Sequence, residues 1–387
     1  MLSSARALPA ALAVAVLALT ACSPTSADAP QPLSGSKGAV AQQDAAPARL
    51  LANVSGPTVA LHHRITVEAR RGDLDDVTLT APDGSTVAGR IRDGVWRQLG
   101  GLLPRTRYLL AASGTNAAGQ VTTRSWRLRT TAPATTDQPA VTPLDGGTVG
   151  VGHPVVVYFH HDVTDKGLVE QRMDISTSQP VEGSWGWLDD RTAAWRPREF
   201  WPAETDVEVT LALAGTELGD GVWVMEDREI DFHVGRSQVL RIDDATHTMH
   251  VQREEGVVRT VEVSMGKPGF ITRSGTKVIM TREESRRMDS ATVDIGGDEA
   301  YDLEVPYAMR LTSTGEFIHG APWSEHAQGS ENVSHGCTNV SLEDAIWLYD
   351  NTLIGDPVVT SGTGRDMEEW NGLGGLWNYT WDEWQQR

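Results

Sequence analysis

The sequence predicts a mainly β protein in which two sandwich domains precede a mixed β domain that carries one short helix. Apolar and polar residues alternate over short runs along most of the chain, and turn-forming Gly, Pro, Asn and Asp separate these runs. A helical spacing of apolar residues stands out after residue 341. The 387 residues are enough for two or three domains, each with its own core.

Residues 1–21 have the features of an export signal. Arg6 supplies a sparse positive region, and the apolar run from Ala10 to Leu19 is too short to cross a membrane comfortably. The run ends in Leu-Thr-Ala-Cys22, which resembles a bacterial lipobox, so we expect Cys22 to be lipidated and to hold the protein on the outer face of the membrane. The alternative is ordinary signal cleavage beside an incidental cysteine.

Residues 22–47 contain mostly Ala, Pro, Ser, Gln and Gly after the cysteine. Such a segment cannot bury enough apolar surface to offset its ordering entropy, so we expect a flexible linker. Such a linker would let the folded domains extend from the membrane into the cell wall.

Residues 48–132 are predicted to form a first sandwich. Alternation favours a single strand from Val59 to Ala69, a second strand that leads into the turn Pro82-Asp83-Gly84, and a hairpin around Gly114–Gly119. Short strands with frequent turn signals are typical of sandwiches.

A second unit of similar size is predicted at 139–235. Its alternating runs lie at 155–159, 207–213 and 230–234. His160, His161 and Asp162 resemble a metal cluster, but adjacent histidines on one strand point to opposite faces, so we expect surface polar residues and no metal or other cofactor.

Residues 236–362 are predicted to form the third domain. The runs 239–251 and 257–265 are expected to pair as two strands around Glu254-Glu255-Gly256, and the polar segment 282–298 is expected to be a mobile loop. Ser341 begins an S-x-x-D start, followed by a short helix and a closing strand at 357–360.

Chemistry is expected between Phe317 and Ser341, where Cys337 lies near two histidines. A thiol with a pKa of ~8.5 is mostly protonated at neutral pH, so a nucleophile needs a base, and His319 and His335 are the candidates. Gly336 allows close approach of the backbone, and N–H groups around the turn suit an oxyanion. The alternative is a buried cysteine with satisfied core histidines.

The spacing of these residues resembles the signature of the L,D-transpeptidase catalytic domain, also called YkuD: His319-Gly320 and Ser334-His335-Gly336-Cys337, separated by a polar connector. The two sandwiches are similar to the Ig-like domains that precede this domain in actinobacterial members. The resemblance makes Cys337 the nucleophile and His319 the proton donor and acceptor, and it gives His335 and Gly336 the turn and oxyanion site. Several members have Ser at the position of Gly320, so no hydroxyl contact is expected there.

The resemblance also implies substrate contacts. In the family the segment at 282–298 is a flap over the active site, and Met288 and Tyr301 match flap residues, although plain packing is the alternative for both. The remaining positions expected to contact substrate are Thr314, Gly315, Trp323, Ser334 and Asn339.

The family activity implied is acyl transfer from a peptidoglycan tetrapeptide stem to an amine on a neighbouring stem, with loss of D-Ala and formation of a 3→3 cross-link. Carbapenems are expected to acylate the same cysteine. Two alternatives stay open: a carboxypeptidase that uses water as acceptor, and a wall-binding scaffold without turnover. The net charge of −19 and the lack of a basic stripe argue against a nucleic-acid partner.

A Trp-rich tail is predicted at 363–387. It contains Trp370, Trp377, Trp381 and Trp384, the last three spaced like one helical face. A sugar-stacking platform is one interpretation, but docking onto the rest of the protein is favoured because exposed tryptophan rows are costly.

Overall fold

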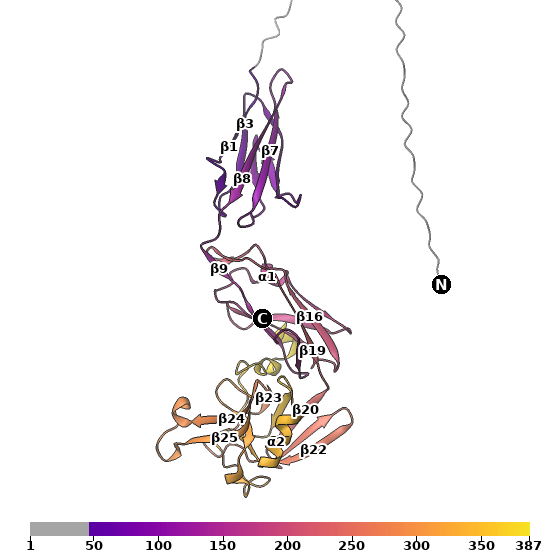
Figure 1. Ribbon diagram of the computed structural model, residues 1–387, viewed down its shortest axis with the longest axis vertical. Coiled ribbons are helices and arrows are strands. Elements are labelled where there is room, and N and C mark those ends of the chain that lie inside the picture. The colour runs from indigo at the N-terminus through magenta and orange to yellow at the C-terminus, as the bar shows by residue number, and fades with distance from the viewer. Residues whose placement is uncertain (1–45) are drawn as a thin grey trace, which may run out of the picture. The chain divides into compact units, whose positions relative to one another are not determined.

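The computed structural model describes residues 46–387 (Figure 1). The predicted export signal, the lipobox cysteine Cys22 and nearly all of the predicted linker lie outside the described residues. Residues 47–387 form one compact unit. Among the described residues, no helix is long and apolar enough to cross a membrane.

The first sandwich encloses a core that includes Leu50, Ile65, Trp96 and Leu110. The prediction of one strand from 59 to 69 is wrong, because the chain turns at 61–62 and its two ends join different sheets. The two sheets, in strand order, are β1 (Arg49–Ala52), β3 (Thr66–Arg70), β6 (Val95–Gln98) and β5 (Gly89–Arg92); and β2 (Thr58–Val59), β8 (Val121–Thr130), β7 (Arg107–Thr115) and β4 (Asp73–Thr80).

The second sandwich packs its sheets around a core rich in Val and Trp. Val155, Val156 and Val157 are all fully buried, so this strand is covered on both faces rather than on one as alternation predicts. The elements are β10 (Ala140–Thr142), β12 (Val155–Tyr158), β15 (Thr192–Pro197) and β14 (Gly183–Trp187); β11 (Gly147–Val149), β19 (Arg228–Val234), β16 (Thr205–Leu211) and β13 (Met173–Thr177); β17 (Thr216–Gly219), β18 (Val222–Val224) and β9 (Thr135–Asp137); and α1 (Lys166–Glu170).

The third domain begins with a five-stranded sheet. The run predicted as one strand at 239–251 is a hairpin, because residues 244–247 form a turn in which His247 has a φ of 49°. The strand order is β22 (Gly256–Glu262), β21 (Thr248–Arg253), β20 (Gln238–Asp243), β28 (Pro357–Ser361) and β23 (Gly275–Val278).

A four-stranded sheet completes this domain: β24 (Thr281–Asp289), β25 (Asp302–Arg310), β26 (Phe317–Gly320) and β27 (Thr338–Val340). The first part of the segment predicted as a mobile loop is therefore a strand, and β24 and β25 form a hairpin that projects from the domain in Figure 1. Its tip holds the 3₁₀ turns η1 (Ser290–Val293) and η2 (Gly297–Glu299).

The predicted helix after the cysteine is confirmed as α2 (Leu342–Asn351). The Ser341 hydroxyl accepts the N–H of Asp344 at 3.1 Å, the N-cap bond that the S-x-x-D pattern predicts. Ala345 and Leu348 bury the apolar stripe against the core beneath the four-stranded sheet. The polar connector before the cysteine folds into turns that include η3 (Pro322–Ser324) and bury Ala327.

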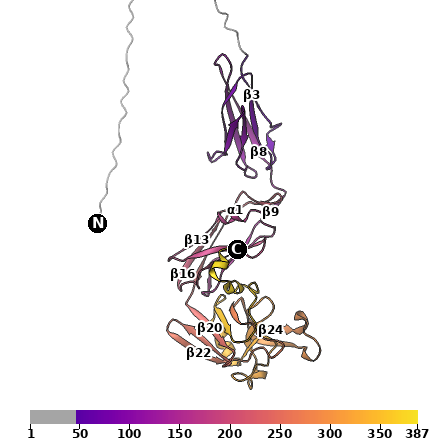
Figure 2. The same ribbon diagram turned by 180° about the vertical axis from the view of Figure 1, so that it is seen from behind.

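The tail docks, as predicted, on the second sandwich (Figure 2). The spacing did not give one helix: Trp377 lies in η4 (Gly375–Asn378), and only Trp381 and Trp384 share α3 (Trp381–Trp384). All three rings surround the guanidinium of Arg196, whose Cζ is 5.0 to 5.3 Å from their centroids. The faces of these rings contact the Arg196 guanidinium and core side chains. They therefore do not form a free platform for stacking a sugar.

Candidate active site

Two parallel strands bring the predicted catalytic residues together. Strand β26 pairs with β27, with Ile318 opposite Thr338 and His319 opposite Asn339. Cys337 directly precedes β27, so it lies at the end of the strand next to the one that carries His319. The connection between parallel strands must cross over, which is the structural reason for the connector between the two motifs.

A cavity of about 270 Å³ collects most of the predicted site. His319 and Cys337 both line it, and so do Trp323, Ser334 and His335. The other lining residues are Met288, Tyr301, Leu303, Val305, Ser324, Val333 and Asn339. Thr314 and Gly315 line a neighbouring cavity instead, although the Gly315 carbonyl oxygen is 3.8 Å from the Cys337 sulfur.

Cys337 is a free thiol of intermediate exposure. Burial raises the pKa of Cys337 to about 12. The thiol is therefore protonated in the free protein at neutral pH, and forming the thiolate requires a base that takes its proton.

His319 is 4% exposed, and its Nδ1 lies 3.0 Å from the Gly320 carbonyl oxygen. A carbonyl only accepts, so Nδ1 carries the proton and Nε2 of the neutral ring is left as the acceptor. Burial lowers the pKa of His319 to about 4, which keeps the ring neutral at physiological pH. The Trp323 ring stacks on this imidazole at 6.0 Å and fixes its plane.

The turn before Cys337 is held by the hydroxyl of one of its own residues, Ser334. Ser334 Oγ donates to the Cys337 carbonyl at 2.6 Å and accepts the N–H of Gly336 at 3.1 Å. Gly336 has a φ of 121°, where only glycine is unstrained, and its carbonyl accepts from Thr272 at 2.9 Å. The Gly336 N–H is thus already used by Ser334, and Gly336 contributes the turn rather than that oxyanion donor.

The side chain of His335 contacts residues near the tip of the hairpin formed by β24 and β25. Its ring packs against Phe270 at 4.7 Å and Tyr301 at 5.0 Å, and Nε2 lies 2.7 Å from a carboxylate oxygen of Glu299. Lys267 donates to the same oxygen at 2.5 Å. These two hydrogen bonds, with Lys267 the stronger, lower the pKa of Glu299. The tip of the hairpin is thereby tied to the turn that precedes Cys337.

Asn339 lines the cavity with a buried amide. Its Nδ2 donates to Ser324 at 3.0 Å, whereas its buried Oδ1 has no hydrogen-bond partner among the described residues. A buried acceptor without a partner costs about 1–3 kcal/mol, so a substrate N–H placed there would be favoured.

Thr314 is held by the tail segment, because its backbone N–H donates to Oδ1 of Asn371 at 3.1 Å.

Comparison with known proteins agrees with this geometry. Residues 237–360 match the family model of the L,D-transpeptidase catalytic domain (YkuD), and residues 57–217 match a bacterial Ig domain. L,D-transpeptidase 2 of Mycobacterium tuberculosis (strain CDC 1551 / Oshkosh) is 36% identical over 326 residues, which cover 83% of this chain and 79% of the relative. The chain belongs to the L,D-transpeptidase family.

Two further relatives of this transpeptidase differ in coverage. L,D-transpeptidase 5 of Mycobacterium tuberculosis (strain ATCC 25618 / H37Rv) is 32% identical over 329 residues, covering 83% of this chain and 72% of the relative. The solved structure of LD transpeptidase LdtMt1 in complex with imipenem has a TM-score of 0.51 and 35% identity, and covers 59% of this chain and 100% of that one.

The transpeptidase also contains a buried ionic cluster that sequence reasoning missed. Glu316 is 4% exposed and lies 2.9 Å from Arg273 and 3.0 Å from Lys277, which is fully buried. Arg273 also binds Glu368 of the tail segment. Glu316 directly precedes β26, so the cluster adjoins the strand that carries His319. No local pattern predicts it, because the three residues meet only through the packing of separate elements.

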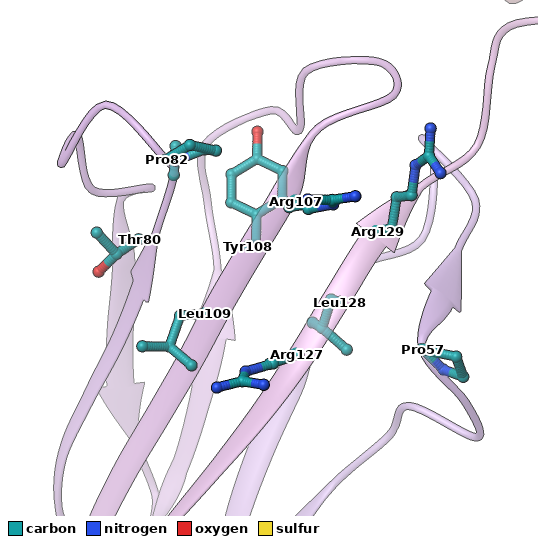
Figure 3. Close-up of a pocket in the computed structure, with 10 residues that line it drawn as sticks. Pro57, Thr80, Pro82, Arg107, Tyr108, Leu109, Arg127, Leu128 and Arg129 are labelled. Atoms are coloured by element: carbon teal, nitrogen blue, oxygen red, sulfur yellow. The ribbon is translucent and has the colours of Figure 1, made fainter.

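Other features of this transpeptidase lie away from the thiol. A cavity of about 750 Å³ lies on the first sandwich around Tyr108, Leu109 and Leu128, and none of the predicted site residues lines it (Figure 3). The argument that His160 and His161 point to opposite faces is wrong, because both follow β12 and both rings bond the buried carboxylate of Asp137. No group of residues within 46–387 has the composition of a metal site.

Proposed function

We propose that this transpeptidase forms 3→3 cross-links in peptidoglycan by two-step acyl transfer through Cys337. The observation that carries the proposal is the cavity that His319, on β26, shares with Cys337, which directly precedes the parallel strand β27, in a chain of this family. The neutral His319 ring has its unprotonated Nε2 available, so it is suited to accept the thiol proton.

In the first step the Cys337 sulfur attacks the carbonyl carbon of the third residue of a tetrapeptide stem, while His319 takes the thiol proton. Collapse of the tetrahedral intermediate breaks the amide bond, and His319 gives the proton to the nitrogen of the departing D-Ala. A thioester remains on Cys337. Asn339 Oδ1, a buried acceptor on the cavity wall, is suited to an N–H of this donor stem.

In the second step an amine of a neighbouring stem attacks the thioester carbonyl. His319 removes a proton from the attacking nitrogen and returns it to the departing sulfur, so the thiol is regenerated and one new amide bond is formed. The scheme predicts ping-pong kinetics, because D-Ala leaves before the acceptor reacts.

Product analysis tests this function. The soluble ectodomain and its Cys337→Ala variant are mixed with a disaccharide-tetrapeptide, and the products are identified by mass spectrometry. A cross-linked dimer with loss of D-Ala, absent in the variant, is the expected result. Tripeptide alone would favour a carboxypeptidase, and no turnover would favour a wall-binding scaffold.

We also propose that a carbapenem acylates Cys337, since a relative of known structure binds imipenem. The Cys337 thiol, which shares a cavity with the neutral His319 ring, is the nucleophile available to open the lactam ring. Intact-protein mass spectrometry with imipenem is expected to give one adduct, and the Cys337→Ala variant none.

The location we propose is the outer face of the cell membrane, with Cys22 lipidated. Its support is the apolar run that ends directly at Leu-Thr-Ala-Cys22. In the native host, metabolic labelling with an alkyne fatty acid should mark the protein, and Cys22→Ala should release it from the membrane fraction. Unchanged membrane retention without label would contradict the proposal.

A further inference from the structure

The charge of the chain is divided unevenly between its domains. Residues 47–132, the first sandwich, contain twelve Arg, no Lys and six Asp or Glu, which gives a formal charge of +6. Residues 133–387 contain 19 Lys or Arg and 44 Asp or Glu, which gives a formal charge of −25. The formal charge of −19 of the whole chain hides this difference, and the first sandwich is the domain that attracts anions.

Three arginines of this domain share the outer face of one sheet. Arg107 on β7 is the cross-strand partner of Arg129 on β8, and Leu109 is the partner of Arg127. The residues between them on each strand are buried, so these four side chains point outward. Like charges directly opposite each other destabilise a sheet, so an anion bound between Arg107 and Arg129 would be favoured.

No carboxylate neutralises this face. Within the described residues none of the three arginines forms an ion pair, and the two ion pairs of the first sandwich lie on the other sheet, at β3 and β5. Asp83, in the turn after β4, accepts two hydrogen bonds from Ser85 instead. The remaining carboxylates of the sheet lie within 73–76, opposite residues 113–115 of β7, which are about 20–27 Å along the strand from Arg107.

The same face borders the cavity of about 750 Å³ on the first sandwich (Figure 3). Its lining combines the three arginines with the apolar side chains of Pro57, Pro82 and Leu109. Leu109 is 46% exposed although it is a large apolar side chain. Cations beside exposed apolar groups match an amphipathic anion, whose phosphate binds the guanidinium groups and whose apolar part covers the leucine.

The proposed lipid on Cys22 indicates which amphipathic anion this domain meets. Only 24 residues separate Cys22 from Pro47, and a flexible linker of that length has a root-mean-square end-to-end distance of ~25–30 Å. The first sandwich would therefore stay close to the phospholipid headgroups. A basic surface is a common second signal beside a lipid anchor, and the same anionic headgroups would repel the acidic remainder of the chain.

We propose that the outer face of the sheet β2–β8–β7–β4 binds anionic phospholipids, with their phosphates on Arg107, Arg127 and Arg129 and with Leu109 among the upper acyl carbons. The first sandwich is then a membrane-binding domain and not only a spacer. The inference goes beyond the proposed acyl transfer and does not depend on it. It uses the proposed lipid anchor only to choose the anion, so a chain without Cys22 tests it separately.

Sedimentation of residues 47–387 with lipid vesicles is the test. At ~0.1 M salt the Debye length is about 10 Å, so charges farther than this from the bilayer contribute little. The protein should bind vesicles of equal parts phosphatidylglycerol and phosphatidylcholine, although its own net charge is negative, and should not bind phosphatidylcholine alone. Binding should be lost at ~1 M salt, where the Debye length is about 3 Å.

The triple variant Arg107→Gln, Arg127→Gln and Arg129→Gln should bind the anionic vesicles about 100-fold more weakly, because each arginine at an anionic surface contributes about 5-fold. Leu109→Ala should weaken binding by up to about 10-fold, because less apolar surface enters the bilayer. All four positions are exposed, so these variants should keep the melting temperature of the wild type. Unchanged vesicle binding in the triple variant would overturn the inference.

The matched control is the triple variant Arg90→Gln, Arg92→Gln and Arg97→Gln, which removes the same charge from exposed positions of the other sheet. Its binding should stay within about 2-fold of the wild type, because this charge lies beyond a Debye length from the bilayer. Equal losses in both triple variants would indicate a net-charge effect and overturn the assignment to this face. Binding to isolated cell walls freed of membrane, without binding to vesicles, would overturn the choice of phospholipid.

Discussion

Replacing Glu316 with Gln should destabilise the catalytic domain strongly. The carboxylate is 4% exposed and neutralises two cations, Arg273 at 2.9 Å and the fully buried Lys277 at 3.0 Å. Glutamine keeps the shape but removes the charge, which leaves the Lys277 ammonium buried without a counter-ion. Removing one partner of a buried pair typically costs about 3–5 kcal/mol. For a domain of this size, that corresponds to a fall in melting temperature of about 6–20 °C.

The loss should depend on pH in a defined direction. Burial lowers the pKa of Lys277, and Glu316 opposes this, so Glu316→Gln lowers the pKa of folded Lys277 further. Below the folded-state pKa of Lys277 in the variant, the loss of folding free energy is fully present. As the pH rises towards the folded pKa of the wild type, the lysine of the variant is neutral and the charge-dependent penalty disappears.

Differential scanning calorimetry from pH 6 to pH 10 measures both effects. Adding Lys277→Met to Glu316→Gln removes the orphaned charge, so the double variant should be more stable than Glu316→Gln alone. A loss below about 1 kcal/mol in the single variant, or a double variant whose losses simply add, would refute the reasoning.

Three other outcomes are expected. Glu299→Gln removes the carboxylate that binds His335 to the tip of the β24–β25 hairpin. Acylation by imipenem should slow by at most about 5-fold, because the pair is exposed, and the backbone amides of the hairpin should exchange hydrogen faster. Unchanged hydrogen exchange would contradict this role of Glu299. Burial raises the pKa of Cys337 to about 12 and lowers that of His319 to about 4. Iodoacetamide should therefore alkylate Cys337 slowly at neutral pH and faster as the pH rises to about 11. Fast alkylation that is constant between about pH 6 and 8 would instead indicate a preformed thiolate. Trp384→Ala, at a fully buried position of the docked tail, should cost about 3–5 kcal/mol and expose residues beyond 361 to proteolysis, and an unchanged melting temperature would contradict this.

The sequence predicted the candidate nucleophile, its candidate base and the capped helix, because each of these predictions depends on local chemistry. His319 and Cys337 belong to a motif with fixed spacing, and Ser341 carries the hydroxyl that caps α2. Strand positions with one buried face also gave clear alternation, as in β16. Where β24 was predicted as a loop, the signal failed because its residues are polar and no side chain on it is fully buried.

The charged partners around the site had no local signal. Glu299 meets His335, and Glu316 meets Lys277, only after separate strands and turns have packed. Electrostatic roles of this kind require the three-dimensional register of the chain.

The central claim is that Cys337 carries the acyl group between donor and acceptor. Its most direct test is intact-protein mass spectrometry of residues 47–387 after brief mixing with a tetrapeptide donor and no amine acceptor, followed by peptide mapping. The account predicts one adduct with the mass of the donor less D-Ala, located on Cys337. An adduct on another residue, or release of D-Ala without any covalent intermediate, would contradict it.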